Sequence, residues 1–371
     1  MKPIGLYLHI PFCDGKCAYC NFFSRCPRAD ISDLTEYTDR LIDSIKAWGK
    51  QLDRPVDTVY FGGGTPSLLG HDRLIRILDA IYRSFDIADH AEVTVEVNPS
   101  STDELDFVRM KQAGFNRLSI GLQSANENEL KLLGRRHSVD DAYRTVKRAQ
   151  TAGFDNISLD VMLAIPEQTI ASLDQTLEFC VSCKVRHISS YILKIEEGTR
   201  FYHMRDQLPL FNDDEQAAFY EYTVQKLAQL GFEQYEISNF SIKGYESRHN
   251  LHYWHDEEYL GLGPSAHSFI DGKRFYYDSD FQCFYKNQIR DESDGGDSDE
   301  YIMLALRLTE GLVFDKYKER FNCSVSDKLI VAAKRLEQQG LCQISDHSIS
   351  LTVKGFLVSN AVIAYLLNHN H

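Results

Sequence analysis

The chain has 371 residues, 43% of them hydrophobic, and a formal net charge of −14, so it can bury one large core or a core with a smaller second domain. The acidic balance argues against a general nucleic-acid-binding surface, because such surfaces neutralise phosphates with Lys and Arg. Nine cysteines are too few for a disulfide-stapled secreted fold. With no signal pattern and no apolar run of transmembrane length, a cytoplasmic protein with at most peripheral membrane contact is expected.

Up to about residue 200, short apolar runs alternate with longer amphipathic stretches. The runs predict strands over residues 4–10, 56–61, 92–97, 117–122, 157–163 and 187–193. The amphipathic stretches predict helices, for example over residues 34–48, 74–85, 138–152 and 170–183. Six βα units at fairly even spacing predict an α/β fold with a parallel sheet, either doubly wound or closed as a barrel.

A cysteine triplet follows the first predicted strand at the spacing C-x3-C-x2-C, and its members are Cys13, Cys17 and Cys20. Thiolates are the ligands of iron–sulfur clusters, and a 4Fe–4S cluster held by protein alone uses four. A triplet without an obvious fourth cysteine would leave one iron open to a non-protein ligand. Structural zinc is the main alternative, with Cys26 as a candidate fourth ligand.

The carboxyl ends of the predicted strands carry glycines and polar residues. A Gly-Gly-Gly-Thr-Pro run follows the second strand at residues 62–66, and polar residues occur in or after the next three, namely Glu96, Gln123, Arg135 and Asp160. The carboxyl ends of parallel strands form the working face of such folds. Each residue alone could belong to a turn or a cap, but together they favour a polar ligand with an amine, a carboxylate and ribose hydroxyls.

Beyond residue 209 the sequence predicts another helix, a short strand and then an aromatic stretch rich in histidine. Its histidines are His249, His252, His255 and His267. Imidazole is a common ligand of metals and of heme. The neighbouring tyrosines and tryptophan equally suit aromatic packing, so both roles stay open from the residues alone.

The last part of the chain predicts a separate small domain. The acidic, glycine-containing residues 291–300 are interpreted as a linker. Helices are expected near residues 303–308, 314–321 and 327–338, before a hairpin-like run over 340–352 and a last helix. This gives a barrel over residues 1–235, an extension over 236–290 and a helical or winged-helix-like domain over 301–371, which we interpret as a lid or partner-binding module.

The motifs resemble a known family. The spacing C-x3-C-x2-C with an aromatic residue before the last cysteine resembles the signature of radical S-adenosylmethionine (SAM) proteins. The runs Tyr-Leu-His-Ile-Pro-Phe-Cys, Gly-Gly-Gly-Thr-Pro-Ser and His-Asn-Leu-His-Tyr-Trp resemble the branch that contains oxygen-independent coproporphyrinogen III oxidases and HemW heme chaperones. The resemblance implies a partial (β/α)6 TIM-like barrel with a C-terminal HemN-type domain.

The resemblance also implies roles for individual residues. The cysteines Cys13, Cys17 and Cys20 would ligate a 4Fe–4S cluster, whose open iron would take the amine and carboxylate of SAM. Tyr7 and Tyr19 would line the cluster and cofactor, and the methionine part of SAM would be held by Gly63, Gly64 and Thr65. Further polar contacts to SAM would come from Glu96, Gln123, Arg135 and Asp160. His249 matches the motif associated with heme binding.

Within this branch the residues favour the chaperone. The oxidases carry a further cysteine where this chain has Phe22, and a long segment before the cluster motif, whereas here the first cysteine is residue 13. Asn21 and Ala164 depart from the family pattern, which usually has an acidic residue and a glycine there. We expect a heme chaperone that passes heme to an acceptor hemoprotein, possibly respiratory, with an electron donor and possibly as a homodimer. The alternatives are a radical SAM coproporphyrinogen III oxidase, which decarboxylates propionate side chains, and a structural zinc protein.

Overall fold

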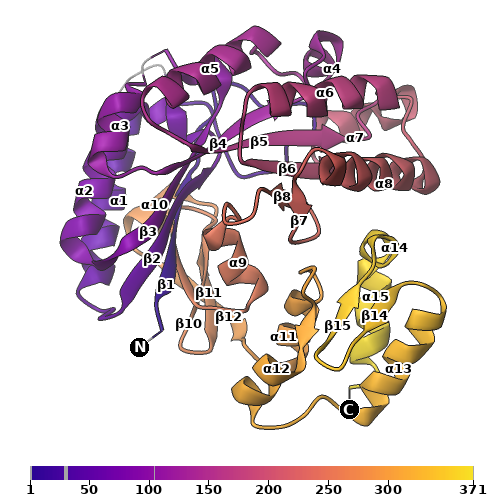
Figure 1. The fold of residues 1–371 in the computed structure, drawn as a ribbon. Helices are drawn as coiled ribbons and strands as arrows, with labels where there is room; N and C mark the ends of the chain where they lie inside the picture. Colours follow the sequence, from indigo (N-terminus) through magenta and orange to yellow (C-terminus); the bar gives the residue numbers. More distant parts are fainter. Residues whose placement is uncertain (1, 29–31, 104, 371) are drawn as a thin grey trace.

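The computed structural model describes residues 2–28, 32–103 and 105–370, which form a curved sheet covered by helices and a smaller domain beside it (Figure 1). Six parallel strands in chain order make a partial barrel, namely β1 (Ile4–Ile10), β2 (Pro55–Gly63), β3 (Asp86–Val97), β4 (Arg117–Gln123), β5 (Asn156–Leu163) and β6 (His187–Ile192). The predicted six-unit α/β fold is therefore confirmed.

Helices cover the outer face of this sheet. They are α1 (Ser32–Gly49), α2 (Gly70–Ser84), α3 (Phe107–Ala113), α4 (Glu127–Leu132), α5 (Val139–Thr151), α6 (Ile170–Ser182), α7 (Arg200–Met204) and α8 (Asp213–Gln229), with single 3-10 turns at η1 (Pro66–Leu69), η2 (Pro99–Ser101) and η3 (Arg205–Gln207). Local signals set several helix starts. Ser138 and Asp141 form a reciprocal capping box at α5, which satisfies backbone N–H groups that have no partner within the helix.

The strands of the barrel bury one face under the helices and turn the other toward the barrel interior. In β4 the outward residues are fully buried apolar side chains, namely Leu118, Ile120 and Leu122. The alternate residues line an internal cavity, namely Arg117, Ser119, Gly121 and Gln123. Since successive side chains of a strand point to opposite faces, one strand supplies both the core and the wall of the site.

Residues 236–290 extend the barrel sheet at both edges instead of forming a separate layer. Strand β9 (Tyr259–Leu262) pairs in parallel with β1 and continues into an antiparallel run, β10 (His267–Ile270), β11 (Lys273–Tyr277) and β12 (Ile289–Asp294). At the opposite edge β8 (Asn239–Ser241) pairs with β6 and with β7 (Glu233–Gln234). Helices α9 (Arg248–Trp254) and α10 (Phe281–Tyr285) complete this region.

The acidic segment that was predicted as a linker over residues 291–300 is mostly regular structure. Strand β12 includes Asp291 to Asp294 and pairs with β11, while α11 (Ser298–Ala305) begins after Asp297, whose side chain caps the helix. All six residues of β12 are exposed. Charged side chains suit an exposed edge strand, because they oppose pairing with another chain. The acidic composition therefore reflects an edge strand rather than a flexible connection.

The C-terminal domain has the small helical and hairpin architecture that the sequence predicts. Its sheet has the order β13-β15-β14, from β13 (Leu312–Val313), β14 (Cys342–Ile344) and β15 (Ser348–Leu351). Its helices are α11, α12 (Phe314–Phe321), α13 (Asp327–Gln338), α14 (Val353–Leu357) and α15 (Ser359–Leu367). In Figure 1 this domain, drawn in orange to yellow, lies below α8 and β7. Backbone hydrogen bonds join it to the barrel extension, from Ile237 N–H to the Arg307 carbonyl (2.9 Å) and from Thr309 N–H to the Tyr235 carbonyl (3.0 Å).

No helix in the part of the chain that the structure describes has both the length and the apolar character that crossing a bilayer requires.

Candidate functional site

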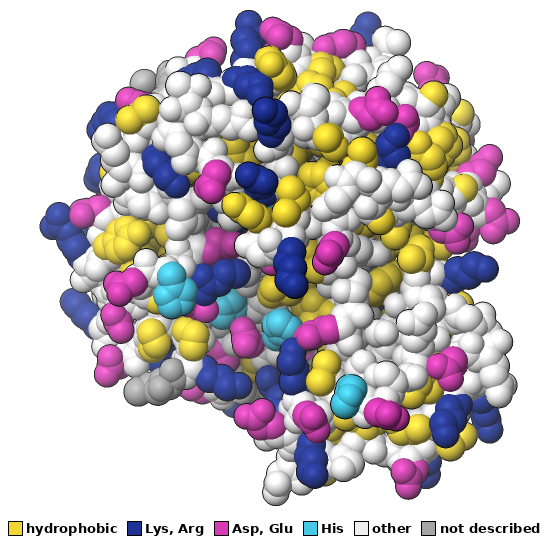
Figure 2. Space-filling model, viewed as in Figure 1, with side chains coloured by type: hydrophobic (Ala, Val, Ile, Leu, Met, Phe, Trp, Pro, Cys, Tyr) yellow, Lys and Arg dark blue, Asp and Glu magenta, His cyan; other side chains and the backbone are white. Residues whose placement is uncertain are grey.

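A cavity of about 1140 Å³ lies inside the barrel and extends to the C-terminal domain. Its wall comes from the cysteine loop, the glycine turn after β2, the inner faces of β3 to β6, and residues 356–361 of the C-terminal domain. In the view of Figure 2, hydrophobic side chains gather where the two parts of the molecule meet. Single ligand pockets usually measure roughly 300–1,000 Å³, so this cavity has room for more than one small molecule.

The cysteine loop between β1 and α1 is held at the cavity by its own backbone and by neighbouring turns. Cys13 N–H donates to the Arg25 carbonyl (3.1 Å), and Ala18 N–H donates to the Leu133 carbonyl (2.9 Å). The Thr65 hydroxyl donates to the Cys13 sulfur at 3.4 Å. Cys13, Cys17 and Cys20 are all free, partly exposed and part of the cavity wall.

His9 fixes this loop and was missed by the sequence analysis. Its Nε2 lies 3.0 Å from the Phe23 carbonyl and its Nδ1 lies 3.0 Å from the Tyr7 hydroxyl. The carbonyl can only accept, so Nε2 carries the proton and Nδ1 accepts from Tyr7. Burial lowers the pKa of His9, which favours the neutral ring that this arrangement needs. The sequence could have identified His9 from its place in β1, because it lies between the core residues Leu8 and Ile10 and so points to the opposite face of the strand.

The geometry of the thiols bears on the zinc alternative. A tetrahedral zinc ion needs its sulfur ligands within about 2.3 Å of one point. Within residues 2–28, 32–103 and 105–370, no three side chains of His, Cys, Asp or Glu are gathered around one such point. Cys26, the candidate fourth ligand, is exposed and does not line the cavity. A cuboidal cluster takes each thiolate at a different iron, so its three ligands need not converge on one point.

The glycine turn after β2 packs directly on the cysteine loop. Gly64 N–H donates to the Ile10 carbonyl (2.9 Å) and Thr65 N–H donates to the Phe12 carbonyl (2.7 Å). A Cβ on Gly64 would lie 2.6 Å from the Phe12 oxygen, and Gly63 has a φ of 108°. Only glycine fits this close approach and this left-handed backbone. The structure thus brings Gly63, Gly64 and Thr65 beside the cysteines.

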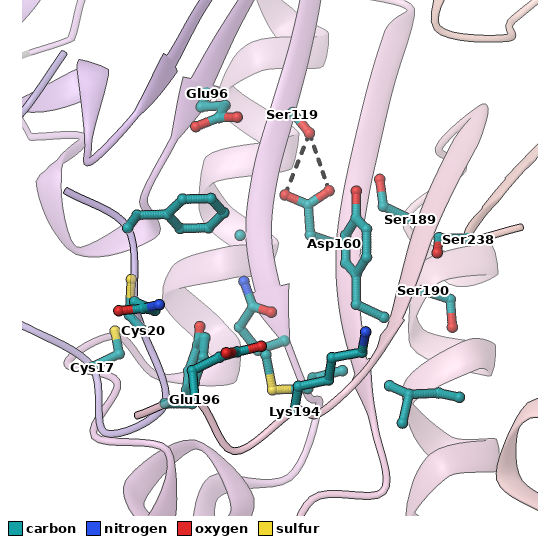
Figure 3. Close-up of a pocket in the computed structure, with 18 of the residues that line it drawn as sticks. Cys17, Cys20, Glu96, Ser119, Asp160, Ser189, Ser190, Lys194, Glu196 and Ser238 are labelled. Carbon is teal, nitrogen blue, oxygen red and sulfur yellow. Dashed lines mark hydrogen bonds between the residues drawn. The ribbon is translucent and has the colours of Figure 1, made fainter. Parts of the chain in front are cut away.

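Two carboxylates line the cavity beyond the glycine turn (Figure 3). Glu96 accepts hydrogen bonds from the Tyr60 hydroxyl (2.9 Å) and from Gly63 N–H (3.2 Å). Asp160 accepts from the Ser119 hydroxyl at 3.1 Å. Burial and the nearby Asp160 charge raise the pKa of Glu96 to about 7, and burial also raises the pKa of Asp160. The cavity therefore holds two carboxylates that are poorly solvated, which favours a cationic ligand.

Arg135 joins three of the motifs at the cavity. Its guanidinium donates to the Gly121 carbonyl (2.8 Å), the Asn98 side-chain oxygen (3.0 Å) and the Cys17 sulfur (3.6 Å). The Nε of Arg135 is buried and has no hydrogen-bond partner among the described residues. A buried donor without a partner costs stability, so this nitrogen is available for an acceptor on a ligand.

Gln123 and Tyr19 complete the set of predicted residues that line the cavity. Gln123 ends β4 with a φ of 70°, a conformation that is strained for a residue with a side chain. Strain of this kind concentrates at functional sites. Tyr19 lies between two cysteines and packs with the apolar cluster around Leu133; burial raises its pKa, so its hydroxyl stays protonated.

Arg117 is a buried cation in the cavity wall that the sequence analysis did not select. It is 2% exposed, and its Nε has no hydrogen-bond partner among the described residues. Desolvation opposes its charge, but Glu92, Tyr60, Tyr235 and Asp160 outweigh this and raise its pKa. Arg117 lies six residues before Gln123 in β4, so the alternation of side chains along a strand could have placed both on the inner face.

Tyr7 and His249 do not line the cavity. The Tyr7 ring lies against Tyr60 and His249, at centroid distances of 6.2 and 6.4 Å. His249 is 1% exposed and lies from α9 against the paired strands β1 and β2, where its Nδ1 lies 2.9 Å from the Thr58 hydroxyl and its Nε2 lies 2.8 Å from the Tyr253 hydroxyl. Burial holds its pKa well below the usual value. With both ring nitrogens bonded, heme ligation by His249 stays a prediction that requires α9 to move.

The other three histidines of the predicted cluster do not share a site. His252 Nε2 lies 2.8 Å from Asp57, His255 Nε2 lies 3.0 Å from Glu310, and His267 Nδ1 lies 3.2 Å from Glu292. Each pairs with a carboxylate on a different element. These contacts favour the packing interpretation of the histidine-rich stretch over a joint metal site.

Replacing His249 by alanine should lower the free energy of unfolding by about 2–4 kcal/mol, because it leaves a cavity and two buried hydroxyls without partners. Chemical denaturation measures this change, and heme titration of the folded variant shows whether binding survives. Unchanged stability with loss of the heme absorption band would instead identify His249 as an iron ligand.

Comparisons with known proteins agree with this geometry. A family model described as Radical SAM superfamily matches residues 7–180, and one described as HemN C-terminal domain matches residues 299–358. The protein named heme chaperone HemW from Lactococcus lactis subsp. lactis (strain IL1403) is 33% identical over 375 residues, which cover 99% of this chain and 98% of that protein. The Bacillus subtilis (strain 168) protein of the same name is 32% identical over 97% of this chain and 98% of its own.

A solved structure shares the fold over nearly the full length. Coproporphyrinogen III oxidase (HemN) from Escherichia coli, described as a radical SAM enzyme, superimposes with a TM-score of 0.83. The match covers 98% of this chain and 90% of that chain, at 21% sequence identity. This likeness shows the fold alone.

Proposed function

Because the chain belongs to the radical SAM superfamily, among full-length relatives named heme chaperone HemW, we propose that it is a heme chaperone. It binds a 4Fe–4S cluster, SAM and heme, and it transfers the heme to an acceptor hemoprotein. The observation that carries this proposal is similarity at 32–33% identity over almost the whole length of those relatives. Phe22, at the position of the additional oxidase cysteine, supports the choice of chaperone over oxidase.

The residues in the cavity fit a cluster and SAM. Three free thiols lie on one loop beside a glycine turn that leaves no space for a Cβ. Arg135 offers a buried Nε without a partner to a carboxylate, and Glu96 and Asp160 offer carboxylates to positively charged or hydroxyl groups. We assign Cys13, Cys17 and Cys20 to the cluster and Gly63, Gly64, Thr65, Glu96, Gln123, Arg135 and Asp160 to SAM.

A bound cluster with SAM supplies one-electron chemistry, so the proposal includes an electron donor. The protein's own part is to position and to shield. The wall formed by β3 to β6 and by residues 356–361 encloses the ligands, and the raised pKa of Glu96 allows a proton to be held at its carboxyl group. The acceptor hemoprotein, a homodimer and a peripheral membrane contact remain part of this proposal.

The test is a heme titration and a coproporphyrinogen III oxidase assay on one anaerobically reconstituted sample. A heme absorption band that saturates, without decarboxylation in the presence of SAM and a reductant, is the expected result. Turnover of coproporphyrinogen III would replace the chaperone assignment by the oxidase. A colourless protein that retains zinc would exclude both.

SAM affinity should depend on pH through Glu96. In the free protein its pKa is raised to about 7, so its carboxyl group is protonated below that pH. SAM carries positive charges that favour the carboxylate, so binding must release the proton there. Affinity should therefore fall by up to about tenfold for each pH unit below 7 and stay level above about 7.5.

The matched variant is Glu96→Gln, which keeps the shape and removes the titration. Its SAM affinity, measured calorimetrically from pH 5.5 to 8, should be weaker but nearly independent of pH. A slope that persists in the variant would assign the proton to another group, with Asp160 the nearest candidate. Protein stability has the opposite sign: the raised folded-state pKa favours the folded state at low pH, and this contribution is lost as the pH rises through about 7.

A further inference from the structure

Part of the wall of the cavity comes from the C-terminal domain. Residues 356–361, at the junction of α14 and α15, line it together with Arg307. None of these residues belongs to a motif that the sequence analysis selected. The cavity therefore contains a second region, which the proposed SAM and cluster residues do not occupy.

Arg307 is a partly buried arginine that forms no ion pair with any described residue. Its Nη1 donates to the Ser359 hydroxyl (2.7 Å) and its Nη2 donates to the Asn360 side-chain oxygen (2.5 Å). Both partners are neutral, and no carboxylate of the described residues forms an ion pair with it, whereas Arg320 pairs with Asp256 at 2.6 Å. Burial lowers the pKa of Arg307, which means that its charged form lacks compensation.

The position of Arg307 is fixed by the backbone. Its carbonyl accepts a hydrogen bond from Ile237 N–H, and two residues later Thr309 N–H donates to Tyr235. Ser359 and Asn360 hold the other end of its side chain. An arginine whose backbone and guanidinium are both held loses little conformational entropy when it binds an anion, and this increases the affinity of the site.

The surface around Arg307 is otherwise largely apolar. The neighbouring wall contains Ile192, Ile237 and Tyr220 from the barrel side, and Phe356, Leu357 and Val358 from the C-terminal domain. Lys194 and Glu196 are two exposed charges of opposite sign that also line the cavity. In Figure 3 Glu196 lies nearer to Cys17 and Cys20, and the Lys194 side chain extends toward Ser190. An apolar surface with one fixed guanidinium suits a flat hydrophobic ligand that carries a carboxylate at its edge.

We propose that Arg307 binds a propionate carboxylate of heme and so orients heme in the region of the cavity between the C-terminal domain and β6. This inference rests on the proposed function, because it names the contact by which the same cavity would hold heme. It assigns the C-terminal domain a direct role in ligand binding, in addition to covering the barrel.

The test compares heme with heme dimethyl ester, in which the carboxylates are masked. The wild-type protein should bind heme about 10- to 100-fold more tightly than the ester, the range expected for a hydrogen bond to a charged group. Arg307→Gln should bind the two ligands with similar affinity, and Arg307→Lys should recover part of the preference. The control Arg335→Gln removes the same charge from an exposed position in α13 and should leave the preference unchanged.

The outcomes separate this inference from the function. If the wild-type protein binds neither heme nor the ester, the proposed function fails. If it binds both equally, the function stands and the carboxylate contact is excluded. Equal weakening of heme and ester by Arg307→Gln would show that Arg307 only holds the domain together. A fall in SAM affinity, with the heme preference intact, would assign the guanidinium to the carboxylate of SAM.

Discussion

Replacing Cys17 by alanine should abolish cluster binding, so that the iron bound after anaerobic reconstitution falls from about four per chain to near zero. The reason is the ligand count. The cavity offers three thiols from one loop, and no other cysteine of the described residues lines it, so no thiolate is in place to replace the one that is lost. Iron analysis and the visible charge-transfer absorption measure the loss. SAM binding should fall with it, since the open iron would be absent.

Cys26→Ala is the matched control for this result. Cys26 follows Cys20 by six residues and is exposed, so it tests the loop without touching the cavity. The variant should keep its full iron content. If it loses iron as completely as Cys17→Ala, or if either variant loses zinc instead, then Cys26 is a ligand and the zinc protein becomes the better interpretation.

The barrel strands could be predicted because their evidence is local. Strand β1 has the predicted bounds, and so do α12 and α13, because the apolar pattern that marks each element lies within its own residues. Strand β12 was missed because its six residues are all exposed and most of them are charged. Its pairing with β11 arises from the sheet, and an apolar pattern cannot report it.

The structure explains one of the two departures from the family pattern. Ala164 follows β5 with a φ of 56°, a left-handed conformation that glycine adopts without cost. The resemblance identified this position as unusual, but only the backbone explains why glycine is common there. Asn21 is exposed at the rim of the cavity, and nothing in the structure explains the change from an acidic residue.

The residues of the candidate site also fall into those that the sequence could identify and those that only the packing of the fold reveals. Its motif residues could be selected because strand ends of a parallel sheet share one edge, and Glu96, Arg135 and Asp160 do line one cavity. Arg307 could not, because it reaches the cavity only through the packing of a separate domain. His249 shows the opposite error: a motif directed attention to it, while burial and two hydrogen bonds place it in the barrel interior.

Arg135→Met should weaken SAM binding by about 100-fold or more, which is the cost expected when one partner of a buried, charged hydrogen bond is removed. Methionine keeps most of the apolar volume of the side chain but offers no donor. The buried Nε, which has no partner within the described residues, is the atom that we assign to the ligand carboxylate. Equilibrium binding of SAM to the reconstituted protein measures the effect, and iron analysis shows that the cluster is still present.

The adjacent residue provides the control, and it separates two explanations of that loss. Arg136 carries the same charge on the same segment, but it is 60% exposed and pairs with Asp14 at 3.5 Å. If SAM binding depended only on positive charge near the cysteine loop, Arg136→Met would weaken it comparably. If it depends on a directed contact inside the cavity, Arg136→Met should change the affinity less than about threefold, since exposed ion pairs contribute little. Because Arg135 also donates to Gly121 and Asn98, its variant should unfold at a lower temperature as well. A loss of stability without a loss of SAM affinity would show that the role of Arg135 is purely structural.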